Sequence, residues 1–142
     1  MNDSLFTELT SLFFTTRQII KAQLPAARNH DPNAWLRFET LRFIAEMKEP
    51  TMQDVAGYLR IKAPSATSLV AHLAKSGFIS RKSQVGDKRI VRITLTARGK
   101  KELRDYMARS AGTMRKAFSK LNDGEINRLV SILRHLRDIH QK

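Results

Sequence analysis

The spacing of hydrophobic residues predicts a chain of helices that is interrupted once by a β-hairpin. Apolar residues recur at steps of three and four, the period of an amphipathic helix, in most of the sequence. The predicted helices cover residues 4–24, 34–47, 52–59, 63–76 and 97–120, with a last one from Asn122 or Asp123 to about 140. Between residues 78 and 95 the period changes to two. The fold class that follows is mainly α with a small β-hairpin, which is α+β.

Capping residues and helix breakers set the limits of the early helices. Pro25 ends the first helix, and Asp31 followed by Pro32 has the pattern of a cap with a proline in the first turn. Thr51 and Asp54 have the spacing of a capping box, in which each side chain binds the backbone of the other residue. These signals predict a connector over residues 25–33 and a short helix after Thr51.

The predicted hairpin follows a left-handed helix cap at Gly77. Residues 78–82 and 90–95 are the expected strands, and residues 85–88 are the expected turn. Thr96 then caps the helix that follows. The hairpin therefore lies directly after the helix predicted for residues 63–76, and its tip is basic.

Composition limits the size and the chemistry of the protein. With 142 residues, 42% hydrophobic and 27% charged, the chain has the size of one domain and enough apolar residues for a packed core. It contains no cysteine, which excludes disulfides, a thiol nucleophile and cysteine-ligated metals. The N-terminus lacks the pattern of a signal peptide, and no apolar run approaches the roughly 18 residues of a membrane span. We expect a cytoplasmic protein.

The chain is strongly basic, and the charge is unevenly placed. The formal net charge is +13. Residues 51–101 hold eleven Lys and Arg residues against Asp54 and Asp87, which gives +9 in about a third of the chain. A solvated basic surface explains most charge runs, but concentration on one helix pair and a hairpin favours a polyanionic partner, nucleic acid first.

The helix over residues 63–76 has one apolar face and one face suited to a nucleic acid groove. Ala66, Leu69, Val70 and Leu73 define the face expected to be buried. The opposite face carries small or hydrogen-bonding side chains and a terminal cation, which allow a close approach to base edges. These residues are Pro64, Ser65, Ser68, Ala71, His72 and Lys75. Alone, the pattern also fits an ordinary surface helix; followed by a basic hairpin, it predicts a winged helix.

The hairpin tip contains the residue best suited to a minor groove. Arg89 is that candidate, because a narrow minor groove concentrates negative potential on an inserted cation. Asp87 is negatively charged and would be repelled by DNA phosphates, so we expect it to pair with Arg89 or to cap the turn. A plain turn residue is the alternative for Asp87.

Several of these motifs resemble the winged-helix core of the MarR family of transcription regulators. Residues 59–70 are similar to the family's turn and recognition helix, Asp87-Lys88-Arg89 matches its D-x-R wing motif, and residues 95–99 resemble its L-T-x-x-G exit. The resemblance implies a winged helix-turn-helix over residues 35–105. The resemblance, together with the outer face of the 63–76 helix and the basic hairpin, gives the predicted DNA-binding residues. They are Lys62, Pro64, Ser65, Thr67, Ser68, His72, Lys75, Arg81, Lys82, Asp87, Lys88 and Arg89.

One position departs from the family pattern. Lys62 stands where members often have Ser or Thr, and lysine cannot accept the capping hydrogen bond from the helix backbone. Ser65 or a DNA phosphate are the alternative caps.

The resemblance also implies a dimer. Residues 1–34 and 106–142 are expected to form a helical dimerisation region that interleaves with a second copy, the whole being one intertwined structural unit. A symmetric dimer presents two recognition helices to half-sites about one DNA turn apart. Completion of a monomer core by the same helices is the alternative.

Family members commonly bind small aromatic or anionic molecules between the two regions. Aromatic and basic side chains that are able to line such a space are Phe13, Arg17, Trp35, Phe38 and Arg42. Core aromatics and solvated arginines are an equally good interpretation of them. The four histidines have no metal-ligand spacing, so we expect neither a metal nor a cofactor.

These observations predict a homodimeric, sequence-specific regulator that binds a pseudo-palindromic DNA duplex, most simply a repressor released by a small ligand. A nonspecific architectural or RNA-binding protein is the alternative that charge alone permits. The sequence contains no phosphate-binding Gly-rich loop, metal cluster or nucleophile motif, so we expect no enzyme.

Overall fold

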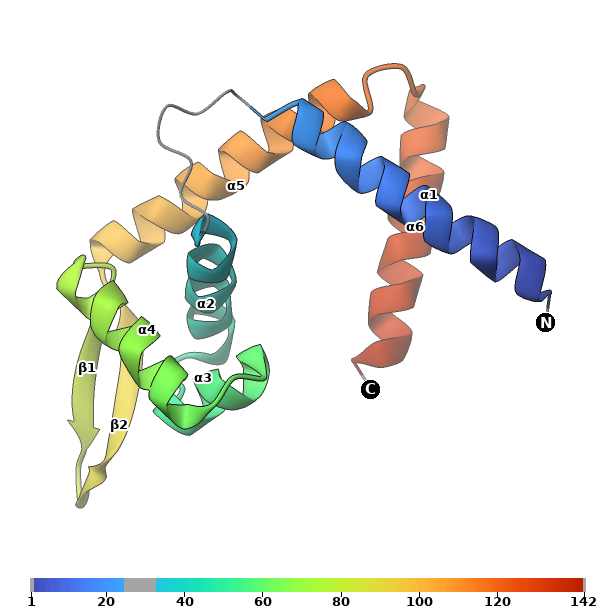
Figure 1. The fold of residues 1–142 in the computed structure, drawn as a ribbon. Coiled ribbons are helices and arrows are strands. Elements are labelled where there is room, and N and C mark those ends of the chain that lie inside the picture. The colour runs from blue at the N-terminus through green and yellow to red at the C-terminus, as the bar shows by residue number, and fades with distance from the viewer. Residues whose placement is uncertain (1, 25–32, 142) are drawn as a thin grey trace. The chain divides into compact units, whose positions relative to one another are not determined.

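The computed structural model describes residues 2–24 and 33–141, and within them it confirms six helices and one antiparallel hairpin (Figure 1). The elements in chain order are α1 (Asp3–Ala22), α2 (Ala34–Met47), α3 (Met52–Leu59), α4 (Ala63–Lys75), β1 (Ile79–Gln84), β2 (Asp87–Leu95), α5 (Ala97–Ala117) and α6 (Asp123–His140). The predicted fold class is therefore confirmed.

The chain divides into two compact units. We call Asn29–Ala108 the winged unit, and Met1–Arg28 together with Arg109–Lys142 the helical unit. The winged unit contains α2, α3, α4, the hairpin and the first part of α5. The helical unit contains α1, the end of α5 and α6.

The predicted capping box starts α3. The Asp54 N–H donates to the Thr51 hydroxyl over 3.1 Å, and the Thr51 N–H donates to the Asp54 carboxylate over 2.9 Å. The hydrogen bond from the Thr51 backbone lowers the pKa of Asp54, so this carboxylate stays ionised and keeps capping the helix. Arg60, in the left-handed region at φ 54°, ends α3 and turns the chain toward α4.

Helix α4 buries the face that the sequence predicts. Ala66, Val70 and Leu73 are buried, and Leu69 is half-buried against the same core. The helix ends at Lys75, one residue before the predicted end, and Gly77 follows with the expected left-handed φ of 83°.

The hairpin is longer than predicted, and its turn is shorter. β1 pairs with β2 from Ile79 opposite Leu95 down to Gln84 opposite Asp87, with a register shift near Ser83. The turn is therefore residues 85–86 alone, with Gly86 at φ 92°, and the prediction of a turn over 85–88 was wrong. The difference arises because Asp87 pairs with Gln84 and Lys88 follows it within β2, although the polarity of both residues is typical of a loop.

One hydrophobic core holds the winged unit together. It gathers buried residues from α2, α3, α4 and both strands, which pack as a single cluster. These residues are Leu41, Phe43, Ile44, Val55, Val70, Leu73, Ile79 and Ile93. The alternating apolar residues of the second strand thus enter the core through Ile93, as their period predicts.

The start of α5 is fixed by a close backbone approach. The Thr96 hydroxyl accepts from the Gly99 N–H over 3.0 Å and donates to the Gly77 carbonyl, which confirms the predicted cap. A Cβ atom built on Gly99 meets the Phe78 carbonyl oxygen at 2.0 Å. Position 99 therefore requires glycine for steric reasons.

Two helix ends differ from the prediction. α1 ends at Ala22 and not at residue 24, and α5 ends at Ala117 and not at residue 120. A turn follows Ala117, and Asn122, in an extended conformation, forms a capping box with Glu125 at the start of α6. The predicted connector over residues 25–33, including the cap at Asp31, lies outside the described residues except for Asn33.

The helical unit exposes its apolar side chains. Neither α1 nor α6 contains a buried residue. Large exposed hydrophobic residues on these two helices are Leu5, Phe6, Leu9, Leu12, Phe13, Phe14, Ile19, Val130, Ile132, Leu133, Leu136 and Ile139. A single copy of the chain therefore leaves these stripes in contact with solvent. No helix within residues 2–24 and 33–141 is long and apolar enough to span a membrane.

Candidate nucleic-acid interface

The outer face of α4 is open to solvent along its length. All seven predicted contact residues from Lys62 to Lys75 are exposed. Their side chains are Lys62, Pro64, Ser65, Thr67, Ser68, His72 and Lys75. Only the Thr67 hydroxyl is engaged in the chain itself, where it donates to the Ala63 carbonyl over 3.0 Å. The serine hydroxyls are therefore available to an external partner.

The N-terminus of α4 has no side-chain cap. Lys62 occupies the cap position without a side-chain hydrogen bond, as its chemistry predicts, and Ser65 does not replace it. Pro64 lies in the first turn, where its missing N–H is not needed. Free backbone N–H groups and the helix dipole attract anions to such a terminus, so it suits a phosphate.

The hairpin carries a second set of exposed basic side chains. Arg81 and Lys82 are exposed on β1, and Lys88 and Arg89 are exposed at the start of β2. Val85 at the turn is 91% exposed, so the tip projects away from the core. α4 packs on β1, and Figure 1 shows the helix beside the hairpin within the winged unit. The structure thus brings the two predicted sets of contact residues together.

Asp87 orients Arg89 at the tip. The Asp87 carboxylate accepts from the Arg89 Nε over 3.2 Å, from Nη2 over 3.3 Å and from the Arg89 backbone N–H over 3.0 Å. These bonds, the side-chain ones first, lower the pKa of Asp87, so its carboxylate stays ionised. The Arg89 side chain is nevertheless 92% exposed. The expected pairing of Asp87 with Arg89 is present in the structure.

Arg92 has a structural role that the sequence did not reveal. Its guanidinium donates to the Gln84 side chain over 2.8 and 3.1 Å and to the Glu49 carbonyl over 3.3 Å. It thus joins the hairpin to the segment between α2 and α3. Only the folded structure shows this role, because the two partners lie 8 and 43 residues away along the chain.

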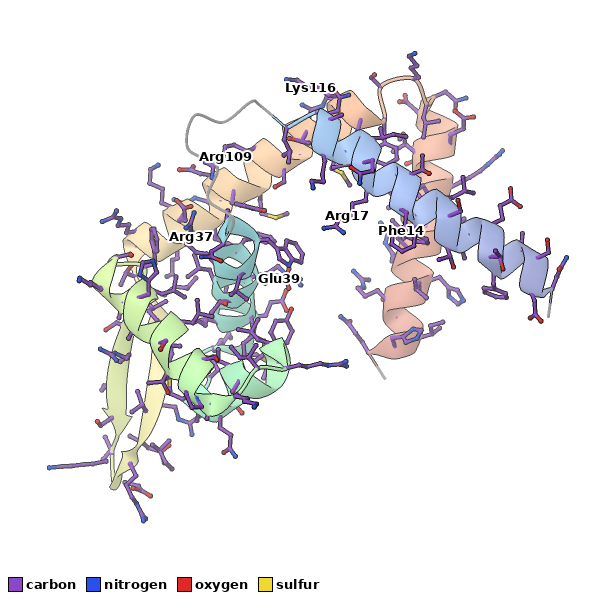
Figure 2. All side chains as sticks on the ribbon, in the orientation of Figure 1. Phe14, Arg17, Arg37, Glu39, Arg109 and Lys116 are labelled. Carbon is purple, nitrogen blue, oxygen red and sulfur yellow. The ribbon has the colours of Figure 1, made fainter. Side chains whose placement is uncertain are left out.

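The five predicted ligand residues are divided between the two units. Phe13 and Arg17 lie exposed on α1 in the helical unit (Arg17 is labelled in Figure 2), whereas Trp35, Phe38 and Arg42 lie on α2. Phe38 is buried and stacks on Tyr106 at 4.3 Å, with Trp35 at 6.1 Å.

Arg42 is bound by other side chains of the winged unit. It donates to Glu39 (labelled in Figure 2), Glu46 and the Tyr58 hydroxyl, and Tyr58 donates to Glu39 over 2.8 Å. Burial and then this bond to Glu39 raise the pKa of Tyr58. Arg42 thus links α2 to α3, and its role as a ligand residue stays a prediction.

The winged unit also contains a cavity of about 510 Å³ that none of these five residues lines. Its walls come from the end of α2, the end of β2 and the start of α5. The lining residues are Ile44, Ala45, Lys48, Glu49, Thr94, Leu95, Lys100, Leu103 and Arg104. In the part of the chain that is described, no group of three His, Asp or Glu residues is placed to hold a metal ion.

Comparison with known proteins identifies this architecture. Residues 35–91, from the start of α2 into the hairpin, match the model of the MarR family. The chain belongs to the MarR family. The family consists of transcription regulators and not of enzymes, in agreement with the expectation from the sequence.

A curated relative of this MarR protein is an uncharacterised HTH-type transcriptional regulator, YsmB, of Bacillus subtilis. The two are 23% identical over 90 residues, which cover 63% of this chain and 62% of the relative. The matched part thus spans less than two thirds of the relative's length.

Solved MarR structures share the fold over nearly the whole chain. A MarR family protein from Bacillus stearothermophilus has a TM-score of 0.76 and 20% identity, and the match covers 100% of this chain and 99% of that one. Streptococcus pneumoniae FabT, solved in complex with DNA, has a TM-score of 0.65 and 20% identity, covering 98% and 96%. Bordetella bronchiseptica BpsR, whose DNA binding is regulated by 6-hydroxynicotinic acid, has a TM-score of 0.61 and 18% identity, covering 94% and 98%.

Proposed function

We propose that this MarR protein is a homodimeric, sequence-specific regulator that binds double-stranded DNA in the cytoplasm, and that it represses transcription until a small ligand releases it. The observation that carries the proposal is the shared exposure of α4 and the hairpin. Hydroxyl, imidazole and cationic side chains on α4 lie open beside a hairpin whose Arg89 is exposed and held by Asp87.

The two surfaces suit the two grooves of a duplex. Helix α4 presents small side chains and an uncapped N-terminus, which fit base edges and phosphates of a major groove. The hairpin tip is narrow and basic, which fits the adjacent minor groove. FabT, a structural neighbour, was solved in complex with DNA, which supports DNA as the partner of this fold.

The second copy is proposed to cover the helical unit. Large apolar side chains lie exposed along both α1 and α6, and contiguous exposed apolar surface marks an interface. Residues 1–34 and 106–142 are the proposed dimerisation region, and residues 35–105 the DNA-binding region. A twofold dimer of this kind recognises a pseudo-palindrome with half-sites about one turn apart.

Arg89→Ala is expected to weaken binding to a selected DNA site about tenfold, because it removes the cation that the hairpin inserts. The slope of log affinity against log salt should become shallower by about one unit per half-site. The measurement is a titration of DNA fragments, selected from genomic DNA by the full chain, at several salt concentrations.

The control for Arg89→Ala is Lys120→Ala, which removes one exposed cation from the helical unit. It should leave the affinity within about twofold of the unchanged protein. The proposal fails if the full chain binds selected and random duplexes equally tightly, which is the behaviour of a nonspecific architectural protein. Preference for RNA over duplex DNA is the other contrary outcome.

Asp87→Ala tests whether Asp87 acts on DNA binding by orienting Arg89 or by its own negative charge. Loss of a negative charge near DNA should strengthen binding if Asp87 only repels phosphates. We expect weaker binding, by about threefold, because Arg89 loses the carboxylate that holds its guanidinium in one direction. Fluorescence anisotropy with the selected fragment checks the sign. Tighter binding contradicts the positioning role of Asp87.

A further inference from the structure

The outer half of the hairpin has no apolar core of its own. Ile79 and Ile93 enter the core at the base of the hairpin, but no residue from 80 to 92 is buried. A two-stranded ribbon without such packing is at best marginally stable in water. The direction of the tip, and with it the place of Arg89, therefore depends on polar contacts.

Arg92 ties this outer half to the segment between α2 and α3. Its Nε and Nη2 donate to the side-chain oxygen of Gln84 over 3.1 and 2.8 Å, and its Nη1 donates to the Glu49 carbonyl over 3.3 Å. Gln84 pairs with Asp87 across the turn, and the Asp87 carboxylate holds Arg89. A series of contacts thus runs from the end of α2 to the tip of the hairpin.

The segment that receives the Arg92 bond is itself fixed to β2. The Ile93 N–H donates to the Pro50 carbonyl over 2.9 Å, and Thr51, the N-cap of α3, forms an isolated β-bridge with Arg92. Residues 48–49 have positive φ angles of 47° and 51°, and a non-glycine backbone of this kind persists only where surrounding contacts hold it. The hairpin is thus attached to the start of α3, which in turn packs on α4.

Arg92 and Arg89 differ in what their side chains can reach. The Arg89 side chain is 92% exposed at the tip, so its guanidinium is accessible to a duplex. Arg92 is half-buried on β2, and each nitrogen of its guanidinium already donates a hydrogen bond within the winged unit. Arg89 is therefore suited to contact DNA, and Arg92 is suited to hold the strand that carries Arg89.

We propose that Arg92, through its bonds to Gln84 and Glu49, is a positioning residue that sets the direction of the hairpin relative to α4. The inference rests on the proposed DNA binding and adds the residue that joins its two contact surfaces. A guanidinium is required because its planar fork directs donors to two acceptors at once, whereas a lysine ammonium keeps only the charge. A tip that is held before DNA arrives loses less conformational entropy on binding, which raises the affinity.

The first measurement follows the order of the tip in the full chain without DNA. Gln84→Ala removes the acceptor without changing the charge, and Arg92→Lys keeps the charge without the fork. In both variants the amide order parameters from NMR relaxation should fall by about 0.2 or more at Gly86 and Lys88 and stay unchanged in α4. The control is Ser83→Ala, which shortens an exposed neighbour of Gln84 on β1 and should leave the tip as it is.

The second measurement is the affinity for the selected duplex in two backgrounds. Gln84→Ala and Arg92→Lys should each weaken binding about threefold, because a loose tip positions Arg89 poorly. In an Arg89→Ala chain the same two substitutions should weaken binding by less than about 1.5-fold, because no tip cation is left to position. General destabilisation would instead cause the same loss in both backgrounds. Arg134→Lys, the same chemical change at an exposed guanidinium of α6, should have no effect in either.

The proposal is overturned if the tip stays as ordered in both variants as in the unchanged chain, or if their effects on affinity simply add to that of Arg89→Ala. The first result means that the hairpin is rigid without Arg92, and the second means that Arg92 supplies stability and not direction. Because the relaxation measurement needs no DNA, a failure there leaves the proposed DNA binding intact. Equal binding of selected and random duplexes contradicts the proposed function instead and leaves the relaxation result valid.

Discussion

Gly99→Ala is expected to lower the free energy of unfolding by about 3 kcal/mol or more. The added Cβ overlaps the Phe78 carbonyl oxygen, a backbone atom that cannot rotate away. Relief requires α5 to move from the end of α4, which breaks the Thr96 bonds to Gly77 and Gly99. The change therefore loosens the junction on which the hairpin, α4 and α5 converge.

The measurement is urea unfolding at one fixed protein concentration, since stability of an associating chain depends on concentration. Gly57→Ala is the matched control: Gly57 lies within α3, and a Cβ there meets no atom within 4 Å. It should leave stability unchanged or raise it by up to about 1 kcal/mol, the difference in helix propensity. If both variants lose the same stability, the close approach at Gly99 is not the cause.

The L-T-x-x-G motif shows which features can be predicted from the sequence and which cannot. Its similarity to the MarR wing exit was visible from residues 95–99 alone. The sequence did not show why the motif ends in glycine, because the atom that excludes a side chain at Gly99 is the Phe78 carbonyl oxygen, 21 residues away. The capping box at Thr51 was predicted in full, since both partners lie within one helical turn. The start of the last helix was left open between Asn122 and Asp123, and the structure places the cap at Asn122.

The hairpin and the cavity show what the sequence conceals. The turn was predicted too long because Asp87 and Lys88 have loop polarity, and only the pairing of Asp87 with Gln84 reveals that β2 begins there. The cavity joins residues from three elements between Ile44 and Arg104, so no local pattern marks it. Conversely, the exposed face of α4 was predictable because a 3.6-residue period fixes which side chains share a face.

The helical unit links these local features to the way the protein acts on DNA. A winged unit contacts a single half-site, and the free energy of two half-sites adds only when a rigid dimer presents both. The exposed apolar stripes of α1 and α6 are thus as important to the proposed function as α4 and the hairpin, although only α4 and the hairpin are proposed to contact DNA.

Leu136→Glu is expected to convert the proposed dimer into monomers and to weaken binding to the selected DNA site by at least about 100-fold. Leu136 lies on the apolar stripe of α6 and is 47% exposed in one copy, so the glutamate costs little within a single chain. In a twofold dimer two such carboxylates become buried in apolar surroundings without a partner, which is strongly unfavourable.

Light scattering measures the mass, and anisotropy with the selected fragment measures the affinity. Ser131→Glu adds the same charge to the polar stripe of α6, formed by Asn127, Ser131, Arg134 and Asp138. It should remain dimeric and bind normally. A Leu136→Glu chain that stays dimeric contradicts the assignment of this stripe to the interface. A monomeric chain that binds as tightly as the unchanged protein contradicts recognition of two half-sites, because cooperation between two copies is what gives the dimer its affinity.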